Sequence, residues 1–276
     1  MGARFDDDTA IAAVDDPPQA PGSPSRRWTA RMDRGWWIER GPNGGYVAAV
    51  VLRALAAAVA DPTRTPRSLT VHYLSPPAEG PVEIDTTVER SGRSMTFVTG
   101  RMRQGGRRLA IAMAAFAPPI AGPEFSDLSP PEVPPPEELA PTVMPPGSPH
   151  IEMRDRYEMR WAIGAAPFSG GARAVSGGWI RLADPRPADH LLVAALTDAW
   201  MPPLFSRLQE RLGVPTIDLT VHFRAPLDTP PPEDWFLVVF RSQMAADGFV
   251  EEDGEVWSRD GRLLAHSRQL AITLSL

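Results

Sequence analysis

A lone aspartate in an apolar stretch is the first candidate for chemistry in this sequence. Asp198 stands in LLVAALTDAWM, where its near neighbours are apolar except Thr197. Burial of a carboxylate removes its hydration and raises its pKa, which makes it a stronger base near neutral pH. The alternative is an aspartate at a helix end that faces water or caps a turn before Pro202. The first interpretation predicts a general base made more basic by its surroundings.

The stretch RGPNGGYV is the second candidate. Asn43 is a good residue to cap a helix, and Gly44 and Gly45 expose backbone N–H groups with no Cβ in the way. A helix N-terminus of this kind can bind an oxyanion or a polarised carbonyl oxygen. The alternative is plain helix initiation with glycines that allow close packing, and the sequence alone leaves both open.

Several other kinds of chemistry find no support in the composition. The chain of 276 residues has no cysteine, which excludes disulfides and thiolate nucleophiles, and its five histidines show no ligand spacing such as HxxxH. We therefore expect no metal. The net charge of −6 gives no attraction to phosphate backbones, so we expect no nucleic acid partner. The first twenty residues lack a signal-peptide pattern, and no apolar run reaches the ~20 residues of a membrane span. We expect a cytoplasmic protein with no membrane partner.

Two segments far apart in the chain nearly repeat each other. SLTVHYLSP, from Ser68 to Pro76, is matched by DLTVHFRAP, from Asp218 to Pro226. Downstream of each lies a Gly turn followed by a strand-like run, QGGRRLAIAMAAF and RDGRLLAHSRQLAI. Upstream of each lies an apolar, helix-like run, Asn43 to Ala60 in the first half and Ala188 to Leu208 in the second. This order predicts a tandem duplication of one α+β unit, helix first and then three or four strands.

The first helix-like run predicts how each unit is built. From Tyr46 to Ala60 only Arg53 is charged, and a helix that is apolar all round must be surrounded by protein. Alternation in SLTVHY suits a sheet with one face on that helix. We expect an α+β protein with a double hotdog fold, in which each unit has a central helix wrapped by a curved antiparallel sheet. The predicted domains are residues 1–117, a proline-rich linker at 118–150, and residues 151–276.

The order and spacing of these segments resemble the double-hotdog acyl-CoA thioesterases of type II, from about Trp28 to Leu274. The segments that resemble the family are WWIERGPNGGYVAAVVLRAL, LTDAW, TIDLTVHF and GRLLAHSRQLAI. The resemblance implies hydrolysis of an acyl-CoA substrate to free acid and CoA, with no further cofactor. It implies that Asp198, Thr216 and Gln269 hold the attacking water. The chain departs from the family at Leu219, where a histidine is common, and in the apolar residues after Asp198.

The predicted substrate contacts are Asn43, Gly44, Gly45 and Trp200. The residues after Asp198 should line the acyl pocket, and Trp36, Trp37 and Met201 are further candidates for its wall. Apolar liners of this kind indicate only that the acyl group is apolar.

Strand alternation alone does not direct two of the implied catalytic residues, Thr216 and Gln269, toward the site. Alternation in PTIDLTVHF places Thr216 on the same face as His222, away from the helix, unless a strand end or a bulge redirects it. Gln269 stands in a strand-like run, where the alternative is a glutamine that faces solvent.

Two rival functions remain open at this point. An enoyl-thioester hydratase or dehydratase of the same fold would place His72 or His222 beside a carboxylate in the pocket. A non-catalytic acyl-CoA-binding protein would bind without turnover. The duplication lets the two units pair within one chain, and it leaves a larger homo-oligomer open.

Overall fold

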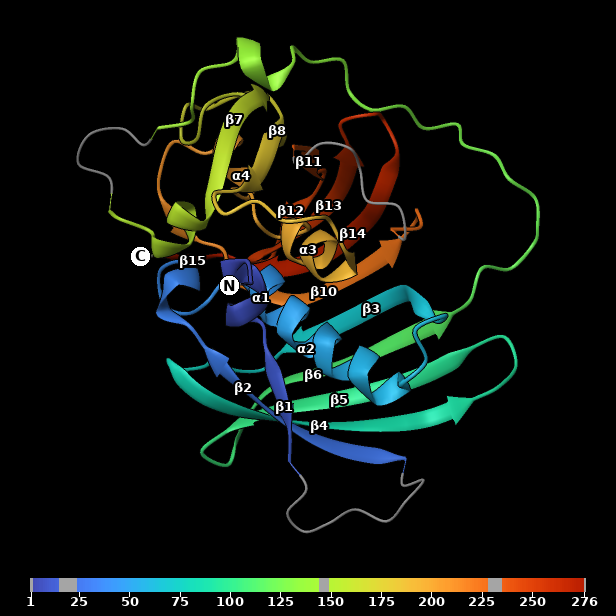
Figure 1. Ribbon diagram of the computed structural model, residues 1–276. Coiled ribbons are helices and arrows are strands. Elements are labelled where there is room, and N and C mark those ends of the chain that lie inside the picture. The colour runs from blue at the N-terminus through green and yellow to red at the C-terminus, as the bar shows by residue number, and fades with distance from the viewer. Residues whose placement is uncertain (1, 15–23, 144–148, 228–234, 276) are drawn as a thin grey trace.

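A single large antiparallel sheet dominates the molecule. The computed structural model describes residues 2–14, 24–143, 149–227 and 235–275. The sheet has 13 strands, and its order is β1-β2-β4-β5-β6-β3-β10-β14-β13-β11-β8-β7, with β12 paired to β13. Figure 1 shows the first half of the chain in blue and green below and the second half in yellow and red above. A separate two-stranded ladder joins β9 (Leu212–Gly213) and β15 (Leu274–Ser275).

The first half contributes one long helix and six strands of the sheet. These elements and the short helices near them are α1 (Arg4–Asp8), β1 (Ile11–Ala13), β2 (Ser25–Met32), the 3-10 turn η1 (Arg34–Trp36), α2 (Gly44–Val59), β3 (Thr65–Tyr73), β4 (Gly80–Ser91), β5 (Thr96–Gln104) and β6 (Arg107–Ala117). The predicted Gly turn between β5 and β6 is confirmed, with positive φ at Gly105 and Gly106.

The second half follows a similar order, with its helix broken in two. Its elements are η3 (Glu152–Arg156), β7 (Tyr157–Ile163), β8 (Ala174–Leu182), α3 (His190–Leu196), α4 (Leu204–Arg207), β10 (Thr216–Phe223), β11 (Phe236–Ser242), β12 (Ala245–Ala246), β13 (Phe249–Ser258) and β14 (Leu263–Ile272). Between the halves, residues 118–143 and 149–150 hold no strand, and one 3-10 turn, η2, covers Pro136–Glu138. The remaining residues of the predicted linker, 144–148, lie outside the described residues.

The repeated LTVH segments pair with each other at the junction of the two halves. Strands β3 and β10 run antiparallel, Thr70 lies opposite Thr220, and their hydroxyl oxygens are 3.0 Å apart. The predicted edge-to-edge pairing of the halves is therefore present within one chain. Leu69 and Val71 are buried while His72 is exposed, which confirms the predicted alternation of β3.

Corresponding strands pair in the same register in the two halves, on either side of this junction. Three inward-facing residues lie side by side on neighbouring strands in each half: Leu69, Ala114 and Val98 in the first, and Leu219, Gln269 and Glu252 in the second. The two sets therefore occupy equivalent places in the strand pairings of the two halves.

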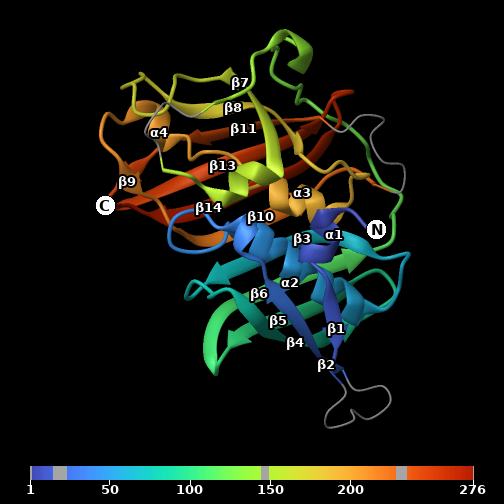
Figure 2. The ribbon, with the colours of Figure 1, turned by 60° about the vertical axis from the view of Figure 1, so that its left-hand side comes forward.

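Helix α2 begins where the sequence predicts and lies at the centre of the structure. The Asn43 side chain accepts a hydrogen bond from the Tyr46 N–H at 3.0 Å and so caps the helix. Most residues from Gly45 to Leu55 are buried, because the helix packs on strands of the first half and on α3. Figure 2 shows α2 and α3 side by side between the lower and upper strands.

The second predicted helix is shorter than expected. We expected a helix-like run from Ala188 to Leu208 broken at the prolines, but α3 already ends at Leu196. The Thr197 hydroxyl donates to the Ala194 carbonyl at 2.7 Å, which competes with the helical hydrogen-bond pattern. Asp198 therefore lies in a turn after the helix and not inside it.

Candidate active site

Asp198 lies against the N-terminus of helix α2. Its Oδ2 atom accepts hydrogen bonds from the Gly45 N–H at 3.0 Å and from the Asn43 side-chain amide at 2.9 Å. The Asn43 amide also donates to the Asp198 backbone carbonyl at 2.6 Å. A carboxylate from the second half is therefore held by the helix N-terminus of the first half.

The two glycines make this approach sterically feasible. A Cβ on Gly45 would lie 2.3 Å from the Ala195 carbonyl oxygen, so a side chain there would collide with the end of α3. A Cβ on Gly44 would lie 2.9 Å from the Asp198 carboxylate. The close-packing interpretation of the glycines therefore applies, and the exposed N–H groups face Asp198. Their predicted contact with a substrate stays a prediction.

The surroundings of Asp198 shift its pKa upward. Although the residue keeps part of its surface exposed, its carboxyl group is enclosed by protein, and this burial raises the pKa to about 6. Hydrogen bonds from Gly45, Gln269, Gly44 and Asn43 favour the charged form and limit the shift. The result is a carboxylate that is ionised at neutral pH and basic enough to accept a proton there.

A β-bulge brings Thr216 to the inner face of the sheet. Thr216 pairs with Ala271 and Asp218 pairs with Leu270, so the register shifts at Ile217 between them. The strand therefore breaks its alternation, and the Thr216 hydroxyl donates to Gln269 Oε1 at 2.9 Å. Strict alternation alone would have placed this threonine on the outer face.

Gln269 points into the protein and joins the other two candidates. It is 7% exposed, so the alternative of a solvent-facing glutamine is wrong. Its side chain accepts a hydrogen bond from Thr216, and its amide favours the charged form of the nearby Asp198. The structure thus brings Asp198, Thr216 and Gln269 into one region of the protein interior.

Glu252 is a member of this group that the sequence analysis missed. Gln269 Nε2 donates to Glu252 Oε1 at 2.6 Å, and the glutamate is 9% exposed on β13. The alternation of residues along β13 could have predicted that Glu252 is buried. The residues that share the buried face of that strand are Val250, Glu252, Gly254 and Val256.

The surroundings of the two carboxyl groups favour the charged form to different degrees. Burial, together with the nearby Asp198 charge, raises the pKa of Glu252 well above its usual range. Asp198 receives hydrogen bonds from several donors, whereas Gln269 is the donor that favours the charged form of Glu252. The surroundings therefore disfavour the charged form of Glu252 more strongly than that of Asp198.

Aromatic side chains surround the site and leave two buried polar atoms without a protein partner. The Tyr73 hydroxyl donates to the Gly44 carbonyl at 2.8 Å. Tyr157 Oη and Trp200 Nε1 are buried and have no hydrogen-bond partner among the described residues. Burial and the Asp198 charge raise the pKa of both tyrosines, so both stay neutral. Tyr157 and Trp200 therefore offer donors to a ligand or a water.

The three tryptophans proposed as pocket walls, Trp36, Trp37 and Trp200, are all buried. Trp36 is 1% exposed and stacks on Tyr46 with ring centroids 4.9 Å apart, as a core residue does. Trp37 is also buried. Trp200 packs on Trp161 at 5.6 Å, and the neighbouring Met201 contacts the Arg154 guanidinium at 3.0 Å. The prediction that Trp200 contacts substrate stays a prediction.

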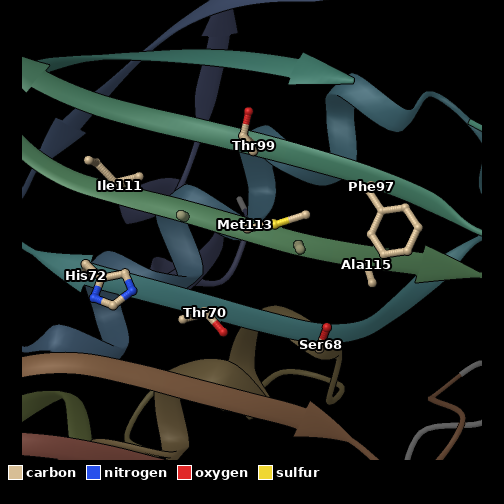
Figure 3. Close-up of a pocket in the computed structure, with 10 residues that line it drawn as sticks. Ser68, Thr70, His72, Phe97, Thr99, Ile111, Met113 and Ala115 are labelled. Carbon is tan, nitrogen blue, oxygen red and sulfur yellow. The ribbon is translucent and has the colours of Figure 1, made fainter. Parts of the chain in front are cut away.

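His72 lies on the opposite side of the sheet from Asp198. A hollow on the outer face of the first half is lined by Ser68, Thr70, His72, Phe97, Thr99 and residues 111–115. Figure 3 shows these side chains on β3, β5 and β6, with α2 behind the strands. No acidic residue lines this hollow.

His222 lies in a second outer hollow with His266, Asp253 and Glu255. These two acids form ion pairs with Arg268 and Arg241. The geometry therefore places neither His72 nor His222 beside Asp198. Among the described residues, no group of three or more histidine or acidic side chains could hold a metal, and no helix is long and apolar enough to cross a membrane.

Comparison with known proteins agrees with this geometry. Residues 33–117 match the family model for the acyl-CoA thioesterase N-terminal domain, and residues 136–273 match that for the C-terminal domain. An acyl-CoA thioesterase 2 of Haemophilus influenzae is 27% identical over 82% of this chain and 85% of its own. An uncharacterised protein of Mycobacterium tuberculosis is 25% identical over 99% of both chains.

Solved structures give the same fold. A hotdog-fold protein from Alicyclobacillus acidocaldarius, 29% identical, superposes with a TM-score of 0.86 over 100% of both chains. A thioesterase II candidate from Thermobifida fusca, 25% identical, gives a TM-score of 0.82 over 99% of this chain and 98% of that one. With family models that cover both halves, this hotdog-fold chain belongs to the acyl-CoA thioesterase family and is a thioester hydrolase.

Proposed function

We propose that the protein hydrolyses an apolar acyl-CoA to free acid and CoA, with a water molecule activated by Asp198 and oriented by Thr216 and Gln269. The observation that supports this most directly is the clustering of these residues. Thr216, on a bulged strand, is hydrogen-bonded to Gln269 on the neighbouring strand, beside the Asp198 carboxylate, whose pKa is about 6. A base with that pKa is ionised at neutral pH and can still accept a proton from water.

The proposed reaction needs one proton acceptor and one group that fixes the water. The Asp198 carboxylate takes a proton as the water oxygen attacks the thioester carbonyl carbon. The C–S bond then breaks, and the CoA thiolate leaves with the proton that Asp198 holds. The Thr216 hydroxyl donates its own hydrogen to Gln269, so its oxygen lone pairs can accept a hydrogen bond from the second O–H of the water, and this hydrogen stays on the water oxygen.

The N-terminus of α2 has two parts in this proposal. Gly45 and Asn43 hold the Asp198 carboxylate in place, as their hydrogen bonds indicate. We also propose that the partial positive charge of the helix N-terminus, where Gly44 lies beside Asp198, polarises the thioester carbonyl of a substrate that contacts Gly44, and that Trp200 contacts the acyl-CoA. The helix dipole favours negative charge at both points.

The architecture that we propose around this site is two hotdog units in tandem, each with a central helix wrapped by its curved sheet. The proposed units are residues 1–117 and 151–276, with 118–150 as the linker. The burial of α2 and the pairing of β3 with β10 support this division. A cytoplasmic location and a homo-oligomer remain predictions.

The test is release of free CoA thiol from short, medium and long acyl-CoAs, compared between the native protein and Asp198→Asn. Because the protein has no cysteine, a thiol reagent reports CoA with little background. Loss of a general base should lower kcat by about 100-fold or more. Circular dichroism should show an unchanged fold.

A control variant separates the rival functions. His72→Ala should keep full turnover, because His72 lies on the outer face of the sheet. Loss of activity in His72→Ala, or a change in enoyl conjugation without CoA release, would favour the hydratase. Binding without turnover across the whole panel would favour a non-catalytic acyl-CoA-binding protein.

A further inference from the structure

Glu252 is a buried acid that the proposed reaction does not use. It lies beside Gln269 on the neighbouring strand, and Gln269 Nε2 donates to its Oε1 atom at 2.6 Å. Burying a carboxyl group costs free energy unless the group has a partner or a task. Gln269 is its partner, which suggests that its task concerns Gln269.

The hydrogen bonds around Gln269 use both ends of its side-chain amide. Its Oε1 accepts from Thr216 at 2.9 Å, and its Nε2 donates to Glu252 Oε1 at 2.6 Å, while the amide also favours the charged form of the nearby Asp198. The oxygen of a primary amide accepts hydrogen bonds and its nitrogen donates them. The Gln269 amide therefore cannot flip without losing both of these bonds.

The first half of the chain shows what the scaffold requires at these positions. Val98 and Ala114 occupy the places of Glu252 and Gln269 there, in the same strand register, and both are buried. The same half also has a register shift at Pro66, the place of Thr216. The scaffold therefore accepts apolar residues at these positions, and the polar set in the second half serves something other than folding.

We propose that Glu252 is a positioning residue of the thioesterase site, which holds the Gln269 amide in its orientation beside Asp198 and Thr216. This inference rests on the proposed function. Glu252 acts through Gln269 and needs no contact with the substrate. It accepts a hydrogen bond at Oε1, and an amide carbonyl at the same place could accept it as well.

The first test compares three single variants by CoA-thiol release. Glu252→Val, which copies the first half, should lower kcat by about 10- to 100-fold, as expected when a buried hydrogen-bond partner is removed. Its KM should stay within about two-fold of the native value. Glu252→Gln keeps an acceptor and should retain most activity. Asp253→Val, on the outer face of the same strand, is the matched control and should leave kcat unchanged.

A double-mutant cycle separates positioning from a general effect on the fold. Gln269→Ala removes the group through which Glu252 acts. Adding Glu252→Val to Gln269→Ala should therefore lower kcat by less than two-fold further. Additive losses, an unaffected Glu252→Val or an effect on KM alone would overturn the proposal. If Glu252→Val unfolds, Glu252→Met takes its place in the cycle.

A measurement that does not depend on catalysis distinguishes failure of this inference from failure of the proposed function. In protein labelled with 15N-glutamine, Gln269→Ala identifies the Gln269 side-chain amide signals. Those signals should move in Glu252→Val and stay in Asp253→Val. If the native protein shows no turnover but the signals move in this way, the hydrolase mechanism fails and the positioning contact stands. Signals that do not move would overturn the positioning role, whatever the activity.

Discussion

The raised pKa of Asp198 predicts that this residue weakens the fold as pH rises. A carboxyl group whose pKa is higher in the folded state binds protons more tightly there than in the unfolded chain. Between the usual value of 3.8 and the folded value of about 6, the folded protein holds more protons. Stability must therefore fall as pH rises through this window and level off above it.

The size of the effect follows from the two pKa values. The full shift of about two units corresponds to about 3 kcal/mol of unfolding free energy, at 1.36 kcal/mol per unit. Between pH 4.5 and 7.5, the part of the window that is convenient to measure, the loss is about 2 kcal/mol. Donors at the α2 N-terminus and on Gln269 already limit the shift, so a larger value is not expected.

The assay is urea unfolding of the native protein and Asp198→Asn at several pH values. Titrating groups far from Asp198 contribute equally to both proteins, so the difference between their unfolding free energies isolates Asp198 together with its coupled neighbour Glu252. The native protein should lose about 2 kcal/mol relative to the variant from pH 4.5 to 7.5. The plot of native kcat/KM against pH should rise through the same value, near 6. A flat difference, or a native protein that gains relative stability with pH, would refute the reasoning, because hydrogen bonds would then outweigh burial.

Two further substitutions test the geometry around the base. Thr216→Val removes the hydroxyl that donates to Gln269 and should lower kcat about 10- to 100-fold without unfolding the protein. Thr216→Ser keeps the hydroxyl and should keep most activity. Equal kcat in the two variants would contradict the role of the hydroxyl. Gly45→Ala places a Cβ 2.3 Å from the Ala195 carbonyl oxygen. This clash should lower the free energy of unfolding, measured in urea, by about 2 kcal/mol or more. Native-like stability would contradict the close packing of α2 on α3.

Much of the scaffold follows from local patterns in the sequence. Alternation in SLTVHY predicts which residues of β3 are buried, and Asn43 predicts the start of α2. The repeated LTVH segments predict a duplicated unit, and the structure adds that they pair at Thr70 and Thr220. These features depend on a few neighbouring residues, so the pattern contains enough information.

The site depends on departures from those patterns, which a single sequence does not reveal. The bulge at Ile217 turns Thr216 inward, and no residue type there requires a bulge. Helix α3 ends early because Thr197 bonds back to the helix and Gly45 packs against its end. Glu252 had a visible signal in the alternation of its strand, but its importance appears only when Gln269 is seen beside it.

A duplication of one unit, as proposed, would explain why the site is asymmetric while the strand pairings are not. Both halves have the register shift and the same strand pairings, yet the first half places Pro66, Ala114 and Val98 where the second has Thr216, Gln269 and Glu252. The first half instead supplies the helix N-terminus that holds Asp198. Two identical subunits would have to carry both features twice. A single chain can give each half one task, because residues in one copy change without changing the other. Neither half alone would hold the base and its donors together.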